Sequence, residues 1–320
     1  MRRFLILLLI FLSPFLLICG VVTIVDPYGL FRANRNQEKR ECALSMDHGI
    51  LSYPVEYKRE PQPNLIIGES RANINLTIIP EEGWSKFSFG GAPTPAYLKS
   101  FWFAAKQGKL KKVILIMDTY SYISAMNMGS DAFEVSEDMI DHPYKYFTSK
   151  LVLETCYKYL TTSKEQVNKT IRTDTAFWNQ QIEHGRSMCT AAVMNKQLFM
   201  KTVEHINLML RDIKEYCDSN DIEIIIVSPS VSVDLINVFC GAGDCYSNAM
   251  RSLVDIFGYV LDFGYSNVFT NNPENYKDPF HLRDFNVYVR GIWEGDTTLY
   301  RTINRNNIET IISESCKQRQ

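Results

Sequence analysis

Short runs of aliphatic residues alternate along this chain with longer segments of helical periodicity, and this alternation restricts the fold most. The runs have no polar residue at every second position, so they are typical of strands that are buried on both faces. The strands predicted in this way are residues 64–68, 86–89, 113–117, 223–227 and 260–262. With helices between them, we predict an α/β fold, a three-layer sandwich with a mostly parallel sheet.

Four segments between or after these runs have the apolar spacing of amphipathic helices. They are residues 94–107, 198–217, 246–260 and 281–293. Thr94 is a suitable cap for the first of them, and Pro95 suits its first turn. Residues 120–195 show no regular period, so we interpret them as an insertion between core elements.

The N-terminal segment differs in composition from the rest of the chain, because residues 4–25 contain no charged side chain. A helix that spans a bilayer needs about 20 apolar residues. We therefore predict one transmembrane helix, with the membrane as a partner. A cleaved signal peptide is the alternative, although no A-x-A cleavage pattern follows. Lipidation at Cys19 is not favoured, because the small residue that precedes the cysteine in a lipoprotein signal is missing.

These patterns define the expected organisation: an anchor at 1–25, a connector at 26–60, and an α/β domain at 61–320 that contains the insertion at about 120–195. Arg2 and Arg3 precede the apolar stretch and favour a cytoplasmic N-terminus. The body is then expected on the extracytoplasmic side of a bacterial inner membrane. In that oxidising environment Cys240 and Cys245 either form a small disulfide or remain two thiols.

Composition excludes some classes of function. Lys plus Arg number 34 and Asp plus Glu number 36, so the formal charge of -2 gives no basic excess for nucleic acid. C-x-x-C and H-E-x-x-H metal motifs and the glycine-rich phosphate loops do not occur. We therefore expect no nucleic acid partner, no metal and no cofactor.

Chemically useful residues follow three of the predicted elements. In open α/β sheets the site lies at the carboxyl ends of the strands. Ser70 follows the first strand on a turn where its hydroxyl could be exposed, although serine is also a common helix cap. Gly90 and Gly91 follow the second strand, where they either admit a ligand or simply allow a positive φ. Later in the chain, Asp278 precedes His281 by three residues, a spacing that lets a carboxylate orient an imidazole.

Together, the Gly-x-Ser turn at Gly68, the glycine turn and the late D-x-x-H make this sequence resemble the SGNH (GDSL-like) hydrolase superfamily, whose sheet is flavodoxin-like. It is most similar to membrane-anchored bacterial SGNH-like proteins, in which an Asp-Pro-Tyr-Gly-Leu-Phe segment, here residues 26–31, follows the span. The resemblance does not extend to residues 120–195.

The resemblance implies a catalytic role for each matching residue. Ser70 would be the nucleophile, His281 the general base and then acid, and Asp278 the residue that orients the histidine. The backbone amides of Ser70 and Gly91, with Gly90 as the alternative, would form the oxyanion hole.

Two positions depart from the family pattern. Glu69 replaces the aspartate of Gly-Asp-Ser, and residues 117–120, Met-Asp-Thr-Tyr, replace the block that supplies an asparagine oxyanion donor. Asn127 is a candidate to replace the missing asparagine donor, but no other feature of the sequence points to it. Loss of one such donor can cost about 10²–10³ in rate.

The resemblance implies an extracytoplasmic acyl-ester hydrolase or O-acyltransferase that acts on cell-surface carbohydrate. The alternative is an inactive SGNH-like domain that binds polysaccharide or its assembly proteins, and the missing asparagine favours it.

Overall fold

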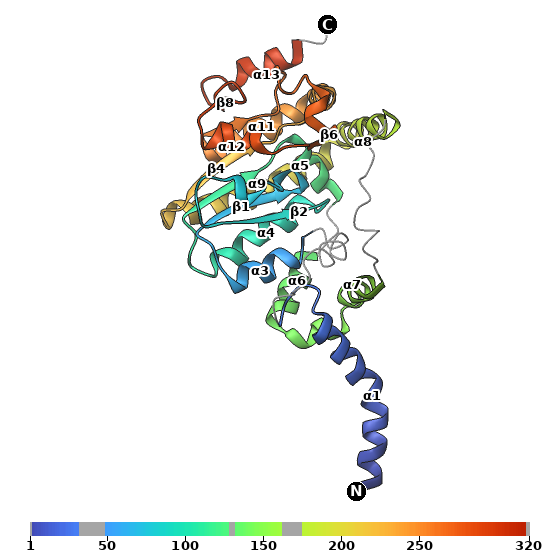
Figure 1. Cartoon of the computed structure of the whole chain (residues 1–320). Helices are drawn as coiled ribbons and strands as arrows, with labels where there is room; N and C mark the ends of the chain where they lie inside the picture. Colours follow the sequence, from blue (N-terminus) through green and yellow to red (C-terminus); the bar gives the residue numbers. More distant parts are fainter. Residues whose placement is uncertain (1, 32–48, 128–131, 162–174, 318–320) are drawn as a thin grey trace. The chain divides into compact units, whose positions relative to one another are not determined.

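The computed structural model describes residues 2–31, 49–127, 132–161 and 175–317 (Figure 1). The chain divides into two compact units. Unit 1 contains residues 1–60 and 131–171, and unit 2 contains residues 61–130 and 172–320. Residues 131–171, which belong to unit 1, are a shorter segment than the predicted insertion at about 120–195.

Unit 1 is helical where the structure describes it. Its helices are α1 (Arg2–Val25), α3 (Ser52–Arg59), α6 (Ala132–Asp141) and α7 (Lys150–Thr161), with the 3-10 helix η4 (Pro143–Thr148). The turn after α1 is held by Asp26, whose carboxylate accepts hydrogen bonds from the backbone N–H groups of Leu30 at 2.9 Å and Phe31 at 3.0 Å. The hydroxyl of Tyr146 also donates to Asp26, at 3.2 Å. Where the structure describes the predicted connector, at residues 26–31 and 49–60, it belongs to the same unit as α1.

The prediction of a transmembrane helix and of the membrane as a partner is wrong. Among the described residues, no helix combines the length and the apolar character needed to cross a membrane. The C-terminal part of α1 contributes to the interior of unit 1 instead, where α1 contacts α7 and Val22 and Val25 are buried.

Unit 2 is built on a sheet of six strands in the order β2-β1-β3-β4-β5-β8, counted over the described residues (Figure 1). The strands are β1 (Asn64–Glu69), β2 (Trp84–Phe89), β3 (Lys112–Ile116), β4 (Glu223–Ser228), β5 (Tyr259–Asp262) and β8 (Arg301–Asn304). β1 to β5 pair in parallel, and β8 pairs antiparallel with β5 at the edge. The five predicted strands are confirmed. β8 was not predicted.

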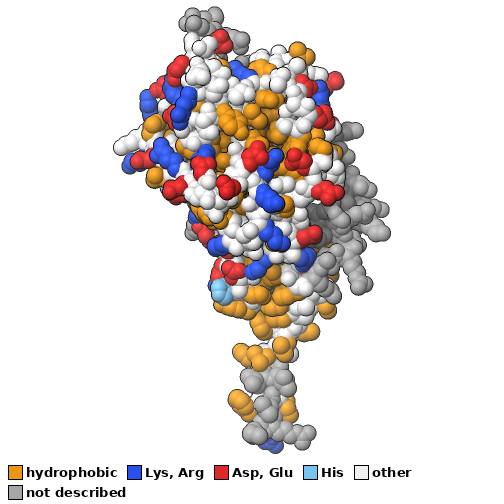
Figure 2. All heavy atoms as spheres, turned by 90° about the vertical axis from the view of Figure 1, so that its left-hand side faces the viewer, with side chains coloured by type: hydrophobic (Ala, Val, Ile, Leu, Met, Phe, Trp, Pro, Cys, Tyr) orange, Lys and Arg blue, Asp and Glu red, His pale blue; other side chains and the backbone are white. Residues whose placement is uncertain are grey.

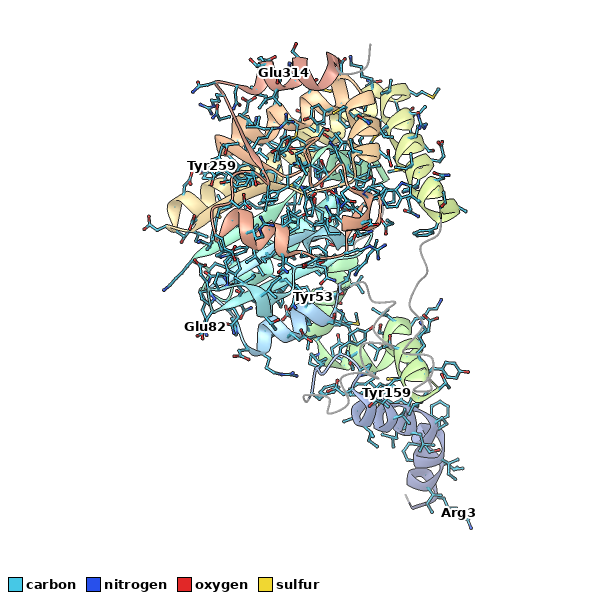
Figure 3. All side chains as sticks on the ribbon, turned by 45° about the horizontal axis from the view of Figure 1, so that its top comes forward. Arg3, Tyr53, Glu82, Tyr159, Tyr259 and Glu314 are labelled. Carbon is cyan, nitrogen blue, oxygen red and sulfur yellow. The ribbon has the colours of Figure 1, made fainter. Side chains whose placement is uncertain are left out.

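Helices cover one face of this sheet. α4 (Thr94–Ala105) contacts β1 and β2, α9 (Lys196–Ser219) contacts β4, and α11 (Asp244–Phe257) contacts β5. Figure 3 shows side chains filling the space between the sheet and its helices. The remaining helices of unit 2 are α5 (Thr119–Ser124), α8 (Thr175–Met194), α10 (Val233–Gly241), α12 (Asn286–Ile292) and α13 (Ile308–Lys317).

The other face is covered mainly by non-helical segments. Its apolar core joins Ile66, Ile114 and Val227 of the sheet to Leu282 and Tyr288. These last two belong to a hairpin, β6 (Tyr276–Asp278) with β7 (His281–Leu282), and to the short helix α12. The predicted three-layer sandwich behind a membrane helix is therefore corrected to a mixed α/β fold with a mostly parallel six-stranded sheet.

The surface of the protein carries charges of both signs. On the face that Figure 2 displays, Lys and Arg side chains are interspersed with Asp and Glu side chains.

Candidate active site

The candidate site begins at Gly68, near the end of β1. A Cβ atom at this position would lie 2.9 Å from the Cβ of Ala72 and 3.1 Å from the carbonyl oxygen of Ile116. Glycine therefore allows the 3-10 turn η1 (Ser70–Ala72) to fold back closely against β1 and β3. This turn presents Ser70, which is half-buried, at the carboxyl end of β1.

We expect Gly68→Ala to lower the free energy of unfolding by about 1–3 kcal/mol, because the added methyl group overpacks this contact. Denaturation by urea measures the loss. Gly20→Ala is the control, because no atom lies within 4 Å of the Cβ that it would add. Equal midpoints for Gly68→Ala and the wild type would contradict the packing argument.

Ser70, His281 and Asp278 are joined by a continuous chain of hydrogen bonds. The Oγ of Ser70 lies 2.7 Å from the Nε2 of His281. The Nδ1 of His281 lies 2.9 Å from each carboxylate oxygen of Asp278. With its proton on Nδ1, the imidazole donates to Asp278 and leaves the Nε2 lone pair to accept from Ser70.

The hairpin fixes the histidine relative to the aspartate. Asp278 and His281 are register partners in the β6–β7 pair. The Oδ1 of Asp278 also accepts hydrogen bonds from the backbone N–H groups of Phe280 at 2.9 Å and of His281 at 3.1 Å. Burial alone would raise the pKa of Asp278, but these hydrogen bonds and the nearby imidazole hold it below its ordinary value.

The hairpin is in turn attached to the loop that follows β4. The hydroxyl of Tyr276 lies 2.8 Å from the Oγ of Ser230 and donates to the carbonyl of Val231 at 3.0 Å. The backbone N–H of Ser232 donates to the carbonyl of Pro279 at 2.9 Å. His281 is thus held at the carboxyl end of the sheet, although it does not belong to the sheet.

One prediction about this segment is wrong at its start. A helix was expected over residues 281–293. His281 lies instead on β7 of a separate two-stranded sheet, and α12 begins at Asn286.

The two glycines predicted for the oxyanion hole follow β2 at the sheet edge where Ser70 follows β1. Glu69 and Phe89 are register partners in the parallel pair of β1 and β2, so Ser70 and Gly90 follow at the same edge. Gly91 has a φ of +66°, which favours glycine, and no atom lies within 4 Å of a Cβ built there. The backbone at Gly91 is therefore open to close approach. Asn127 ends a 3-10 turn, and its side chain lies outside what the structure describes.

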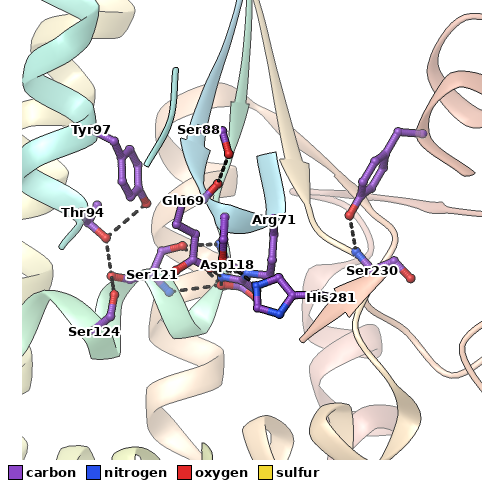
Figure 4. A network of polar contacts seen from close by, with 12 residues as sticks. Glu69, Arg71, Ser88, Thr94, Tyr97, Asp118, Ser121, Ser124, Ser230 and His281 are labelled. Atoms are coloured by element: carbon purple, nitrogen blue, oxygen red, sulfur yellow. Dashed lines mark hydrogen bonds and ion pairs between the residues drawn. The ribbon is translucent and has the colours of Figure 1, made fainter. Parts of the chain in front are cut away.

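A buried ionic cluster surrounds the serine turn, and sequence reasoning missed it (Figure 4). Arg71 forms ion pairs with Glu69 and with Asp118, which lies two residues after the end of β3. All three side chains are at least nine-tenths buried. Burial raises the pKa of Glu69 despite the opposing charge of Arg71. The position of Asp118 just after the third predicted strand was the available signal, because the same rule selected Ser70.

Aromatic rings lie next to both the cluster and the hairpin. The guanidinium of Arg71 stacks 5.2 Å from the ring centroid of Tyr120, and that ring lies 5.0 Å from the ring of Phe280. Burial raises the pKa of Tyr120 to about 12, so the phenol keeps its proton at neutral pH. These rings form an apolar border beside His281.

A groove of 740 Å³ runs between α8 and α10. Its lining combines an indole ring with amide, carboxylate, guanidinium and hydroxyl groups: Trp178, Asn179, Arg186, Thr190, Asp234 and Asn237. The indole N–H of Trp178 donates to Asp234 at 3.1 Å, across the two helices. Because α10 follows directly after Ser232, the groove adjoins the loop that holds the hairpin.

Of the two alternatives for Cys240 and Cys245, a disulfide or two thiols, the structure has the two thiols. Cys240 and Cys245 are both free and buried. Burial raises the pKa of Cys245 above its ordinary value, which keeps this thiol protonated and weakly reactive. Among the described residues, no group of three or more His, Cys, Asp or Glu side chains is arranged to hold a metal ion.

Comparisons with known proteins identify no relative. No protein-family model, curated protein or solved structure matches the chain.

Proposed function

We propose that this protein is a serine acyl-ester hydrolase or O-acyltransferase of the SGNH type. The observation that carries the proposal is the hydrogen-bond chain from Asp278 through His281 to Ser70. An aspartate, a histidine and a serine in this order make up the arrangement that activates serine in unrelated acyl-transfer enzymes.

The reaction would proceed in two steps. His281 Nε2 takes the hydroxyl proton while Ser70 Oγ attacks the carbonyl carbon of the ester. The negative charge that develops on the carbonyl oxygen would be stabilised by the backbone amides of Ser70 and Gly91 or Gly90. When the tetrahedral intermediate collapses, the protonated Nε2 gives its proton to the departing alcohol, and an acyl-serine remains.

Water or a sugar hydroxyl would then attack the acyl-serine, with His281 again acting as the base. Water gives hydrolysis, and a sugar hydroxyl gives O-acylation. The groove between α8 and α10 supports a carbohydrate substrate, because its lining combines an indole ring with several hydrogen-bonding side chains, the groups that complement the apolar and polar faces of a pyranose.

A fluorophosphonate probe tests the proposal directly. We expect it to label the folded protein at neutral pH and to form its adduct on Ser70, which peptide mass spectrometry can locate. Heat-unfolded protein is the control and is expected to remain unlabelled.

A non-catalytic polysaccharide-binding domain is the second candidate. It is favoured by the side chain of Asp118, which is engaged by Arg71 at the place where the family supplies an oxyanion-stabilising asparagine. For this candidate we expect neither labelling nor hydrolysis of acetyl esters between pH 6 and 9. That result, in folded protein, would refute the enzymatic proposal.

A further inference from the structure

Both residues next to the candidate nucleophile are held by buried charges. Glu69 precedes Ser70 and Arg71 follows it, and their side chains form an ion pair with each other. Arg71 also engages Asp118 through two contacts, Nη1 to Oδ2 at 2.5 Å and Nη2 to Oδ1 at 3.0 Å. The residues on either side of Ser70 are therefore connected, through Arg71, to the carboxylate of Asp118 after β3.

Asp118 is itself fixed by the helix that it caps. Its Oδ1 accepts the backbone N–H of Ser121 at 3.1 Å, and the backbone N–H of Asp118 donates to the Oγ of Ser121 at 3.2 Å. This reciprocal capping box belongs to the first turn of α5. Through Arg71, the position of the serine turn is linked to the start of a helix.

We propose that Arg71 is a positioning residue, which holds the serine turn so that Ser70 Oγ stays within hydrogen-bond distance of His281 Nε2. The inference deepens the proposed function and rests on it for the catalytic part. A nucleophile displaced by about 1 Å can lose about 10² in rate. A turn of three residues has little hydrogen bonding of its own with which to prevent such a displacement.

Energetics favour a positioning role over one in stability alone. Removing three charged side chains from water is costly, and a buried ion pair is often no more stabilising than apolar residues of the same size. The two-pronged contact of a guanidinium with a carboxylate does, however, fix direction as well as distance. The cluster is thus better suited to geometry than to stability.

The test compares Arg71→Lys with a matched control, Arg301→Lys. Lysine keeps the charge but loses the planar fork. Arg301 also pairs with a buried aspartate, Asp262, at 2.8 Å, and it also stacks on a tyrosine ring, Tyr265, at 5.0 Å. This second arginine lies at the β5–β8 edge, on the first residue of β8.

For Arg71→Lys we expect kcat for p-nitrophenyl acetate to fall by about 10²-fold, with KM changed little. Arg301→Lys is expected to keep the wild-type kcat, even if its melting temperature falls as much as that of Arg71→Lys. Equal losses of activity in the two variants would show a purely structural role and overturn the proposal.

A second measurement does not depend on activity. In protein with ¹⁵N-labelled histidine, the Nε2 resonance of His281 reports the hydrogen bond from Ser70, and Ser70→Ala defines its value when that bond is lost. We expect Arg71→Lys to move the resonance toward the Ser70→Ala value and Arg301→Lys to leave it unchanged. A wild-type resonance in folded Arg71→Lys would overturn the positioning role.

The same measurement separates the two proposals. If the wild type is not labelled by a fluorophosphonate but the resonance responds as expected, only the enzymatic proposal fails. Should Arg71→Lys not fold, Asp118→Asn replaces it, because the amide keeps the cap to Ser121 while it loses one acceptor for Arg71. A smaller shift in the same direction is expected, and no shift would overturn the inference.

Discussion

Ser70→Ala is expected to lower kcat for ester hydrolysis by about 10⁶-fold, the loss that follows removal of the nucleophile from a triad of this type. The variant lacks the oxygen that lies 2.7 Å from the Nε2 of His281, so no acyl-serine can form there. Its fold should survive, because Ser70 is half-buried and its hydroxyl bonds a residue that also has Asp278 as a partner. Steady-state kinetics with p-nitrophenyl acetate measure the loss.

Ser100→Ala is the matched control for this prediction. Ser100 is a buried serine of α4 whose Oγ donates to the backbone carbonyl of Tyr97 at 2.6 Å. The control is expected to retain the wild-type rate. If Ser70→Ala hydrolysed the ester as fast as Ser100→Ala, the nucleophile would have to be sought elsewhere.

Asp278→Asn is expected to lower kcat by about 10⁴-fold, as in the serine-protease precedent. The amide can place its NH₂ group against Nδ1, and the imidazole then carries its proton on Nε2, where it cannot accept from Ser70. Asp138→Asn is the control, because Asp138 also bonds a histidine Nδ1, that of His142 at 2.9 Å, in unit 1. Activity of Asp278→Asn close to that of the control would contradict the orienting role.

The same aspartate has an expected effect on stability. Because its pKa is lowered in the folded protein, the ionised form is favoured by folding. That contribution is present above the pKa of the unfolded chain and is lost as pH falls through the lower folded value. The difference in unfolding free energy between the wild type and Asp278→Asn should therefore be largest near neutral pH and shrink toward strongly acid pH.

The main sheet could be predicted from the sequence because its strands consist of consecutive aliphatic residues. Such runs, for example Ile66–Ile67 in β1 and Ile225–Ile226 in β4, indicate strands that are buried on both faces. The segment around His281 was harder, since Leu282, Phe285 and Tyr288 imitate a helical period while the first of them belongs to a hairpin. Strands as short as β6 and β7 are too short to show an alternating hydrophobic pattern in the sequence.

For the site, residue types at strand ends predicted Ser70, Gly90 and Gly91, and the spacing of Asp278 and His281 predicted their pairing. Sequence spacing could not predict that Arg71 would meet Asp118, because that contact depends on how β1 and β3 lie in the sheet. The apolar N-terminal stretch was misleading for a related reason. Hydropathy alone does not show that Val22 and Val25 are buried within the protein's own unit 1.

The hydrogen bond between Ser70 and His281 joins positions 211 residues apart. At a ribosomal rate of about 5–20 residues per second, the serine is synthesised about 10–40 s before its base exists. During that interval the nascent chain carries Ser70 without its hydrogen-bond partner. The proposed activity toward esters is therefore expected only after the last part of unit 2 has left the ribosome and folded.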